Sequence, residues 1–360
     1  MDDVEGTDLT TPQLEAPHKR LQQGSRSFER AVVAGYKAFA WAISHVPPAI
    51  PRVILGRGAQ LSYVLWPTKR RWSNANFGHV LGLPPDDRRV RQTALRAYME
   101  YGRYVVELAR LPKLAREHAD RLVPGTDLDA IHRLWEESKG GLIFSLGHVG
   151  NGEAAAAGVA SRGWPINVLA DDSAFPGLFE EISRTREQWG VNVIPWRNLR
   201  EIYTVLRRRE MLALLIDWGY RSDGIPVKLF DAWTTLPAGP ATLAAKTGSR
   251  ILPITLRRNE DGRTFSISWA DPIEVTSSDP AALQAASQRM ADALAASIGQ
   301  APEQWYSFKP IWPANPSEQE LLARRAAAMQ ANEAVQANEA VQANEAVAAQ
   351  PGPEPATEPG

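Results

Sequence analysis

Leu142-Ile-Phe-Ser-Leu-Gly-His-Val-Gly-Asn-Gly-Glu153 carries the clearest pattern in this chain of 360 residues. Its first five residues are apolar apart from one serine, which is typical of a short buried strand. Gly147 ends this run, and a glycine-rich turn then carries His148 into an alanine-rich segment that favours a helix. The stretch therefore predicts a strand, a tight turn and a helix, with His148 and Glu153 held near the turn.

His148 and Glu153 are the candidate catalytic residues of this segment. An imidazole can accept a proton from a hydroxyl group at neutral pH, and a carboxylate beside it can fix its tautomer and stabilise the imidazolium. We therefore predict that His148 acts as a general base and that Glu153 orients it. The spacing alone also fits a histidine with a structural or surface role, because such pairs occur by chance in many proteins.

The rest of the chain alternates between apolar runs and amphipathic segments. Candidate strands cover residues 142–146, 166–170, 192–195, 212–216, 251–256 and 264–269, and helices fit at 127–138, 152–162, 176–189, 198–208, 237–247 and 280–299. Strands separated by helices of this length predict an α/β fold whose mostly parallel or mixed sheet is flanked by helices. We expect this α/β domain to span residues 113–316. Residues 1–27 are expected to be a disordered leader, and residues 317–360, with their Gln-Ala-Asn-Glu-Ala-Val repeats, a low-complexity disordered tail.

Residues 28–112 are expected to form an N-terminal helical region. Apolar residues recur at helical spacing over 27–43, 52–65 and 86–110, and the basic run 69–71 lies beside Trp66 and Trp72. Apolar helices followed by basic and tryptophan residues fit a region that lies on an anionic bilayer. The same pattern fits a core-facing helical subdomain with a solvated basic edge, and the sequence leaves both interpretations open.

Composition argues against several kinds of chemistry. The 40 Lys and Arg residues nearly balance the 41 Asp and Glu residues, so no overall charge favours nucleic acid. The absence of cysteine excludes disulfides, a thiol nucleophile and cysteine-ligated metal. The six histidines form no zinc-binding pair, so we expect no metal site. The sequence contains no run of 18 apolar residues, so we expect no membrane-spanning helix.

Four further segments follow the first one along the chain. They read Arg184-Thr-Arg-Glu-Gln-Trp-Gly-Val-Asn-Val-Ile-Pro195, Leu214-Leu-Ile-Asp-Trp-Gly-Tyr220, Leu236-Pro-Ala-Gly-Pro-Ala-Thr-Leu-Ala-Ala-Lys-Thr-Gly248 and Pro302-Glu-Gln-Trp-Tyr-Ser-Phe-Lys309. In this order, the five segments resemble the bacterial lipid A biosynthesis acyltransferase family, including its actinobacterial branch, the phosphatidylinositol mannoside acyltransferases. The likeness covers about residues 30–313, and the segment that begins at Leu236 is more similar to the actinobacterial branch.

The resemblance implies a fold, an activity and a location. The fold would be a glycerolipid-acyltransferase-like mixed sheet flanked by helices, with an N-terminal helical membrane-associating region. The activity would be transfer of a fatty acyl chain from acyl-CoA or acyl carrier protein, with no other cofactor, to a hydroxyl of a lipid A-like or phosphatidylinositol mannoside-like glycolipid. The location would be peripheral, on the cytoplasmic face of the inner (plasma) membrane.

The resemblance also assigns residues. His148 and Glu153 stand where the family has its His-x-x-x-x-Asp/Glu pair. Arg186 matches a basic residue beside the family's active site, and Asp217 matches an acidic position after a later strand. We assign Arg186, Asp217 and Asn151 in the glycine-rich turn to substrate binding or to stabilising an oxyanion. A surface salt bridge for Arg186 and a turn cap for Asp217 are the structural alternatives.

Three departures from the family pattern leave the acceptor open. Gly152 stands where an aromatic residue is usual, Trp218 replaces a charged or amide residue, and the closing segment ends in Lys-Pro-Ile-Trp312. No Gly-x-Ser-x-Gly elbow accompanies the histidine, which favours direct attack by the acceptor over an acyl-enzyme. Two alternative functions remain: an acyl-thioester hydrolase that uses the same base on water, and a catalytically inactive lipid-binding homologue.

Overall fold

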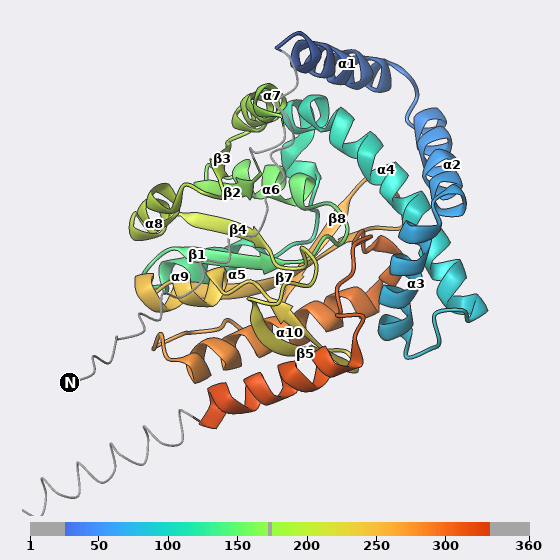
Figure 1. The fold of residues 1–360 in the computed structure, drawn as a ribbon. Coiled ribbons are helices and arrows are strands. Elements are labelled where there is room, and N and C mark those ends of the chain that lie inside the picture. Colours follow the sequence, from blue (N-terminus) through green and yellow to red (C-terminus); the bar gives the residue numbers. More distant parts are fainter. Residues whose placement is uncertain (1–25, 172–174, 332–360) are drawn as a thin grey trace, which may run out of the picture.

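The computed structural model describes residues 26–171 and 175–331, and a six-stranded sheet lies at the centre (Figure 1). Its strand order is β3-β2-β4-β1-β7-β8. All neighbouring strands are parallel except β7 and β8, which are antiparallel. The strands are β1 (Leu142–Leu146), β2 (Ile166–Ala170), β3 (Val191–Pro195), β4 (Met211–Leu215), β7 (Arg250–Arg258) and β8 (Phe265–Trp269). The predicted α/β class, with a mixed sheet flanked by helices, is confirmed.

The central strands are apolar throughout because helices cover both faces of the sheet. Along β1, Ile143 packs into one core cluster, whereas Leu142, Phe144 and Leu146 pack into the other. The cluster with Ile143 includes residues of α8 (Leu199–Arg207), α9 (Gly239–Thr247) and α10 (Pro280–Gln300). The second cluster includes residues of α5 (Leu128–Glu136) and α6 (Gly152–Ala160). Strands buried on both faces read as continuous apolar runs, as β1 does.

The N-terminal third is helical, as expected. It comprises α1 (Arg26–His45), α2 (Ala49–Leu65), α3 (Pro67–Leu81) and α4 (Arg88–His118), and α1 and α2 lie at the periphery, away from the sheet (Figure 1). The pattern missed α3, which begins at Pro67 and carries few apolar residues. Among the described helices, none has the length and apolarity needed to cross a bilayer.

Two further elements differ from the expectation. A hairpin of β5 (Ile225–Leu229) and β6 (Ala232–Leu236) was not predicted, because Pro226 argues against a strand. Its turn residue Phe230 has a φ of 54°. The remaining elements are α7 (Pro176–Glu187), η1 (Ala119–Arg121) and η2 (Pro302–Gln304).

The composition also predicts a disordered tail from residue 317, and this is wrong over residues 316–331, which form a helix. Leu322 and Ala326 are buried in that helix, and Gln319 hydrogen-bonds to the backbone of Trp233. An amphipathic face therefore exists where the composition suggested only solvated residues. The rest of the predicted tail, and the predicted leader up to residue 25, lie outside the described residues.

Candidate active site

The pairing register of two neighbouring strands places His148 beside Asp217. Leu146 at the end of β1 pairs with Leu215 at the end of β4, and each functional side chain stands two residues further along its strand. The amide of Ile216 donates to the carbonyl of Leu146 at 3.0 Å, so the register continues past the strand ends. The carboxyl ends of parallel strands are where open α/β sheets place their ligand sites.

The Asp217 carboxylate is the centre of this arrangement. Its Oδ1 lies 2.6 Å from Nδ1 of His148, and its Oδ2 accepts from the His148 amide at 2.9 Å and from the Trp305 indole Nε1 at 2.8 Å. A carboxylate can only accept hydrogen bonds, so Nδ1 of the neutral imidazole carries the proton and Nε2 keeps its lone pair. Nε2 has no hydrogen-bond partner among the described residues, and the His148 side chain is 33% exposed. The imidazole is thus ready to accept a proton from outside.

Burial and charge act in opposite directions on this pair. Burial lowers the pKa of His148, but the charge of Asp217 and its hydrogen bond raise the pKa more, and the net direction is upward. Burial also raises the pKa of Asp217, whose side chain has no exposure, yet His148 and the hydrogen bonds from Trp305 and the backbone bring that pKa below its ordinary value. The carboxylate therefore stays ionised and favours an imidazolium when one forms.

The prediction that Glu153 orients His148 is wrong. Both oxygens of Glu153 bind Arg186: Nε donates to Oε2 at 2.8 Å, and Nη2 donates to Oε1. Both side chains are largely buried, and a fork of this kind fixes the guanidinium in its plane. Glu153 points to α7 because it occupies the first turn of α6, whereas the strand order brings Asp217 to the imidazole.

Asn151 is the N-cap of α6, and both polar atoms of its buried side chain bind the protein. Its Oδ1 accepts from the Ala154 amide at 3.0 Å, which caps the helix, and its Nδ2 donates to Glu107 at 3.1 Å. The amides of Gly152 and Glu153 follow this cap and have no partner among the described residues. A helix N-terminus with free amides favours negative charge, so the backbone at this turn is suited to an oxyanion even though the Asn151 side chain is not.

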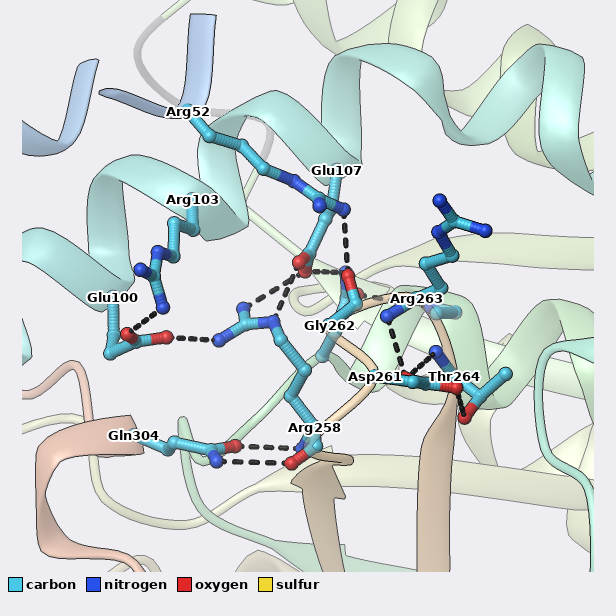
Figure 2. A network of polar contacts seen from close by, with 12 residues as sticks. Arg52, Glu100, Arg103, Glu107, Arg258, Asp261, Gly262, Arg263, Thr264 and Gln304 are labelled. Carbon is cyan, nitrogen blue, oxygen red and sulfur yellow. Dashed lines mark hydrogen bonds and ion pairs between the residues drawn. The ribbon is translucent and has the colours of Figure 1, made fainter. Parts of the chain in front are cut away.

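A buried ionic cluster joins α4 to the end of β7 (Figure 2). Arg258, at the end of β7, donates from Nε and Nη2 to the two oxygens of Glu107 at 2.6 and 2.9 Å and from Nη1 to Glu100. Glu107 also accepts from Asn151, so α4 is tied to the start of α6. The Arg258 guanidinium further donates to the Tyr306 hydroxyl at 3.3 Å. We call Arg258, Glu107 and Glu100 the Arg258 cluster.

The closing segment completes the turn through its backbone. The amide of Tyr306 donates to the His148 carbonyl at 2.8 Å, and the amide of Gly150 donates to the Gln304 carbonyl at 3.0 Å. Gly150 has a φ of 65°, and a Cβ there would lie 2.6 Å from the Leu256 carbonyl oxygen, so only glycine fits. These contacts fix the backbone of the turn that carries the His148 imidazole.

An apolar cavity of about 40 Å³ lies between α6 and the sheet. Its walls include Leu146 and Gly152 beside the turn, and Ala155 of α6 and Leu256 of β7 further in. A Cβ on Gly152 would contact Leu146 and Leu256 at 3.5 and 3.7 Å, so the missing side chain leaves room at the end nearest His148. An apolar space beside a polar site is suited to a hydrocarbon chain.

Sequence reasoning therefore found the base and the residues around it, but it missed several partners. Trp305 was quoted only as part of a motif, and Glu107 and Arg258 gave no signal, although charged residues are rarely buried unless paired. Within residues 26–171 and 175–331, no three His, Asp or Glu side chains converge as metal ligands would. The arrangement is an imidazole that is bound at Nδ1 by a buried carboxylate and is open at Nε2.

Comparisons with known proteins identify the family of this chain. Residues 21–313 match the model of the family described as bacterial lipid A biosynthesis acyltransferase. The phosphatidylinositol mannoside acyltransferase of Mycolicibacterium smegmatis is 28% identical over 308 residues, covering 83% of this chain and 96% of that protein. The proteins of the same name from two strains of Mycobacterium tuberculosis are 31% identical over 255 residues, covering 68% of this chain and 77% of theirs.

Proposed function

This chain belongs to the bacterial lipid A biosynthesis acyltransferase family, and from that premise we propose that it moves a fatty acyl chain from a thioester donor to a hydroxyl of a phosphatidylinositol mannoside-like glycolipid. It is an acyltransferase by family and by its relatives. The observation that carries the proposed mechanism is the imidazole of His148, bound at Nδ1 by Asp217 and open at Nε2. The acceptor is taken from the names of the relatives, and a lipid A-like acceptor is the variant to test beside it.

The reaction begins with proton transfer. Nε2 of His148 takes the proton of the acceptor hydroxyl as its oxygen attacks the thioester carbonyl carbon, and a new carbon–oxygen bond forms. The tetrahedral intermediate then expels the thiolate as the carbon–sulfur bond breaks, and the imidazolium returns the proton to sulfur. Asp217 stabilises the imidazolium between the two steps. A positioned base of this kind contributes a rate factor of roughly 10²–10⁴.

The negative charge of the intermediate needs donors in place before it forms. The free amides of Gly152 and Glu153 supply them at the start of α6. We assign the positive charge of Arg186 to the same task, because Glu153 in the first turn of α6 binds that guanidinium and holds it in a fixed plane. Glu153 therefore serves the reaction as the support of Arg186, in place of the predicted contact with His148.

The acyl chain of the donor is assigned to the cavity beneath α6. This cavity is apolar and begins at Gly152, beside the turn that carries the base. Its volume of about 40 Å³ is small for an acyl chain, so the chain would widen it on entry. The donor is an acyl-CoA or an acylated carrier protein, which share the thioester.

The exposed face of α2 supports peripheral binding to an anionic bilayer. Ile50, Val53, Ile54, Leu61 and Leu65 are each more than half exposed, and they recur at the spacing of one helix face. Trp66 follows them, with the Lys69 ammonium 5.9 Å from its ring, and Arg70 and Arg71 come next. Apolar residues bordered by tryptophan and basic groups match the apolar boundary and the anionic headgroups of a membrane surface.

A vesicle assay tests this surface. Replacing Ile54 and Leu61 together with Asp is expected to abolish co-sedimentation with vesicles of phosphatidylglycerol and phosphatidylcholine. Leu321→Asp is the matched control, since Leu321 is 51% exposed on the helix over 316–331. Equal sedimentation of both variants with the wild type would remove α2 from the membrane contact.

Transfer of radiolabelled palmitate tests the reaction itself. The enzyme is incubated with labelled palmitoyl-CoA and either a phosphatidylinositol mannoside or a lipid A precursor, and products are separated by chromatography. Label on the mannoside that His148→Ala does not produce supports the proposed function, and label on the precursor alone changes the acceptor. Label released only as fatty acid would identify a hydrolase. Lipid binding without turnover, with carrier-protein thioesters included, would identify an inactive homologue.

A further inference from the structure

Trp218 lies beside the ring of His148 and is not part of the cavity wall. It follows Asp217 directly, and its ring meets the His148 ring edge-on, with 5.5 Å between the ring centroids and 90° between the planes. Trp218 is 47% exposed, whereas Asp217 beside it is buried. The cavity walls include neither Trp218 nor Lys309. A large apolar ring is thus exposed to solvent beside His148, and packing in the core does not account for its position.

Lys309 completes this surface. Its ammonium lies 5.4 Å from the centre of the Trp218 ring, and it forms no ion pair within the described part of the chain. The backbone holds it there: the Lys309 carbonyl accepts from Asn76 at 2.7 Å, and the next carbonyl, that of Pro310, accepts from the Tyr220 amide at 2.9 Å. An exposed cation is therefore fixed beside an exposed indole.

We propose that Trp218 and Lys309 form the acceptor subsite, in which the sugar that carries the reactive hydroxyl packs on the indole and a phosphate of the same lipid pairs with the ammonium. This proposal rests on the proposed function and deepens it. The C–H face of a sugar ring is apolar and weakly positive, and it matches the negative face of an indole. A phosphodiester matches a lysine without an acidic partner.

Distance favours the acceptor over the donor. A group that rests on Trp218 lies beside the His148 ring, whose centroid is 5.5 Å from that of the indole, and the hydroxyl to be deprotonated must also lie beside this ring. The adenine of CoA also stacks on aromatic rings, but the pantetheine arm separates it from the thioester. The acyl chain is apolar and would gain nothing from Lys309. A sugar bearing the nucleophile is the group that fits both residues.

Michaelis constants for the two substrates test the subsite. With phosphatidylinositol mannoside as acceptor and palmitoyl-CoA as donor, Trp218→Ala is expected to raise the acceptor KM about threefold to tenfold. Trp218→Phe keeps an aromatic face and should restore most of that loss. Lys309→Gln is expected to raise the acceptor KM at low salt and less at high salt. None of the three should change the donor KM.

Trp196→Ala is the matched control. Trp196 is 49% exposed, follows β3 at the same edge of the sheet, and has the Arg197 guanidinium 5.1 Å from its ring centre. An unchanged acceptor KM in this variant shows that losing any exposed indole is not enough. Thermal melting of each variant checks the fold, and Trp218→Phe stands in if Trp218→Ala does not fold.

The outcomes separate this proposal from the proposed function. No transfer by the wild type to any glycolipid would defeat the proposed function. Transfer by the wild type with an unchanged acceptor KM in Trp218→Ala would defeat the subsite alone. A raised donor KM would place the CoA adenine on Trp218. Weaker sedimentation of Trp218→Ala with vesicles that contain no glycolipid would place the indole in the bilayer, and either result overturns the proposal.

Discussion

The Arg258 cluster and the His148–Asp217 pair are both buried charge pairs at the same edge of the sheet, and they differ in what they leave open. In the cluster, the side chains of Arg258 and Glu107 are only 5% and 8% exposed, and all three guanidinium nitrogens donate to a carboxylate. In the pair, Asp217 is sealed but His148 keeps Nε2 and one third of its surface free. A strand-end location and a buried carboxylate are common to both. The proposed base differs from the Arg258 cluster in having a nitrogen, Nε2 of His148, that is free to accept a proton.

Removing the free nitrogen should have the largest effect. His148→Ala is expected to lower kcat for acyl transfer by about 10²–10⁴-fold, because the acceptor hydroxyl loses its base. The melting temperature is also expected to fall, because the buried Asp217 loses its ionic partner, so kcat is compared below the melting temperature of the variant. A kcat within tenfold of the wild type would show that another group takes the proton.

Breaking the ion pair between Arg258 and Glu107 should instead reduce the stability of the fold. Glu107→Gln keeps the shape of the side chain but leaves Arg258 with one carboxylate, and the free energy of unfolding is expected to fall by about 3–5 kcal/mol. Urea denaturation measures this change. The control is Asp223→Asn, whose pair with Arg221 has both side chains 68% exposed. Its effect should stay below about 1 kcal/mol, and equal effects would contradict the burial argument.

Asp217→Asn sharpens the comparison through the pH profile. A general base works when it is neutral, so wild-type kcat should rise with pH. Because the pKa of His148 is raised, the midpoint of this rising limb should lie above the ordinary value of about 6.5. Removing the carboxylate takes away the charge that raises this pKa, so the rising limb should move to lower pH. The maximal rate should also fall about 100-fold or more, because the tautomer is no longer fixed. A limb that does not move would detach Asp217 from the base.

The smallest effect is expected at Lys309. Its positive charge lowers the pKa of His148 in opposition to Asp217. Lys309→Gln should therefore move the rising limb of kcat to higher pH, by less than about one pH unit because the ammonium is exposed. The difference should shrink at about 1 M salt, where screening is strong. A shift that persists in salt would indicate a contact stronger than an exposed charge can make.

The sequence predicted local features well and distant partners poorly. The run 142–153 gave the strand, the turn, the helix and His148, because all of these depend on neighbouring residues. The partner of His148 depends on the pairing of β1 with β4 across 69 residues of chain, which no local pattern encodes. Glu153 was predicted as the partner because it lies five residues after His148 and matches the acid of the family's pair.

Other partners were out of reach on the same grounds. Arg258 and Glu107 are 151 residues apart, and each looks like an ordinary surface charge in its own segment. The β5–β6 hairpin was hidden by Pro226, and the helix over 316–331 was missed because the low-complexity repeat beside it was read together with it as one tail. Strand pairing overrode the local preference in the hairpin, whereas the helix agrees with the high helix preference of its alanine residues.

The hydrogen bond from Trp305 to Asp217 has a consequence for biosynthesis. At roughly 5–20 residues per second, the 88 residues between them take about 4–18 s to be translated. During that interval the nascent chain holds the imidazole and its acid without the indole and the Tyr306 amide that fix them. A chain released before Pro302 would lack both donors. Under the proposed mechanism, the His148–Asp217 pair is therefore complete only after the closing segment has been translated and folded, and a product that ends before it should be inactive.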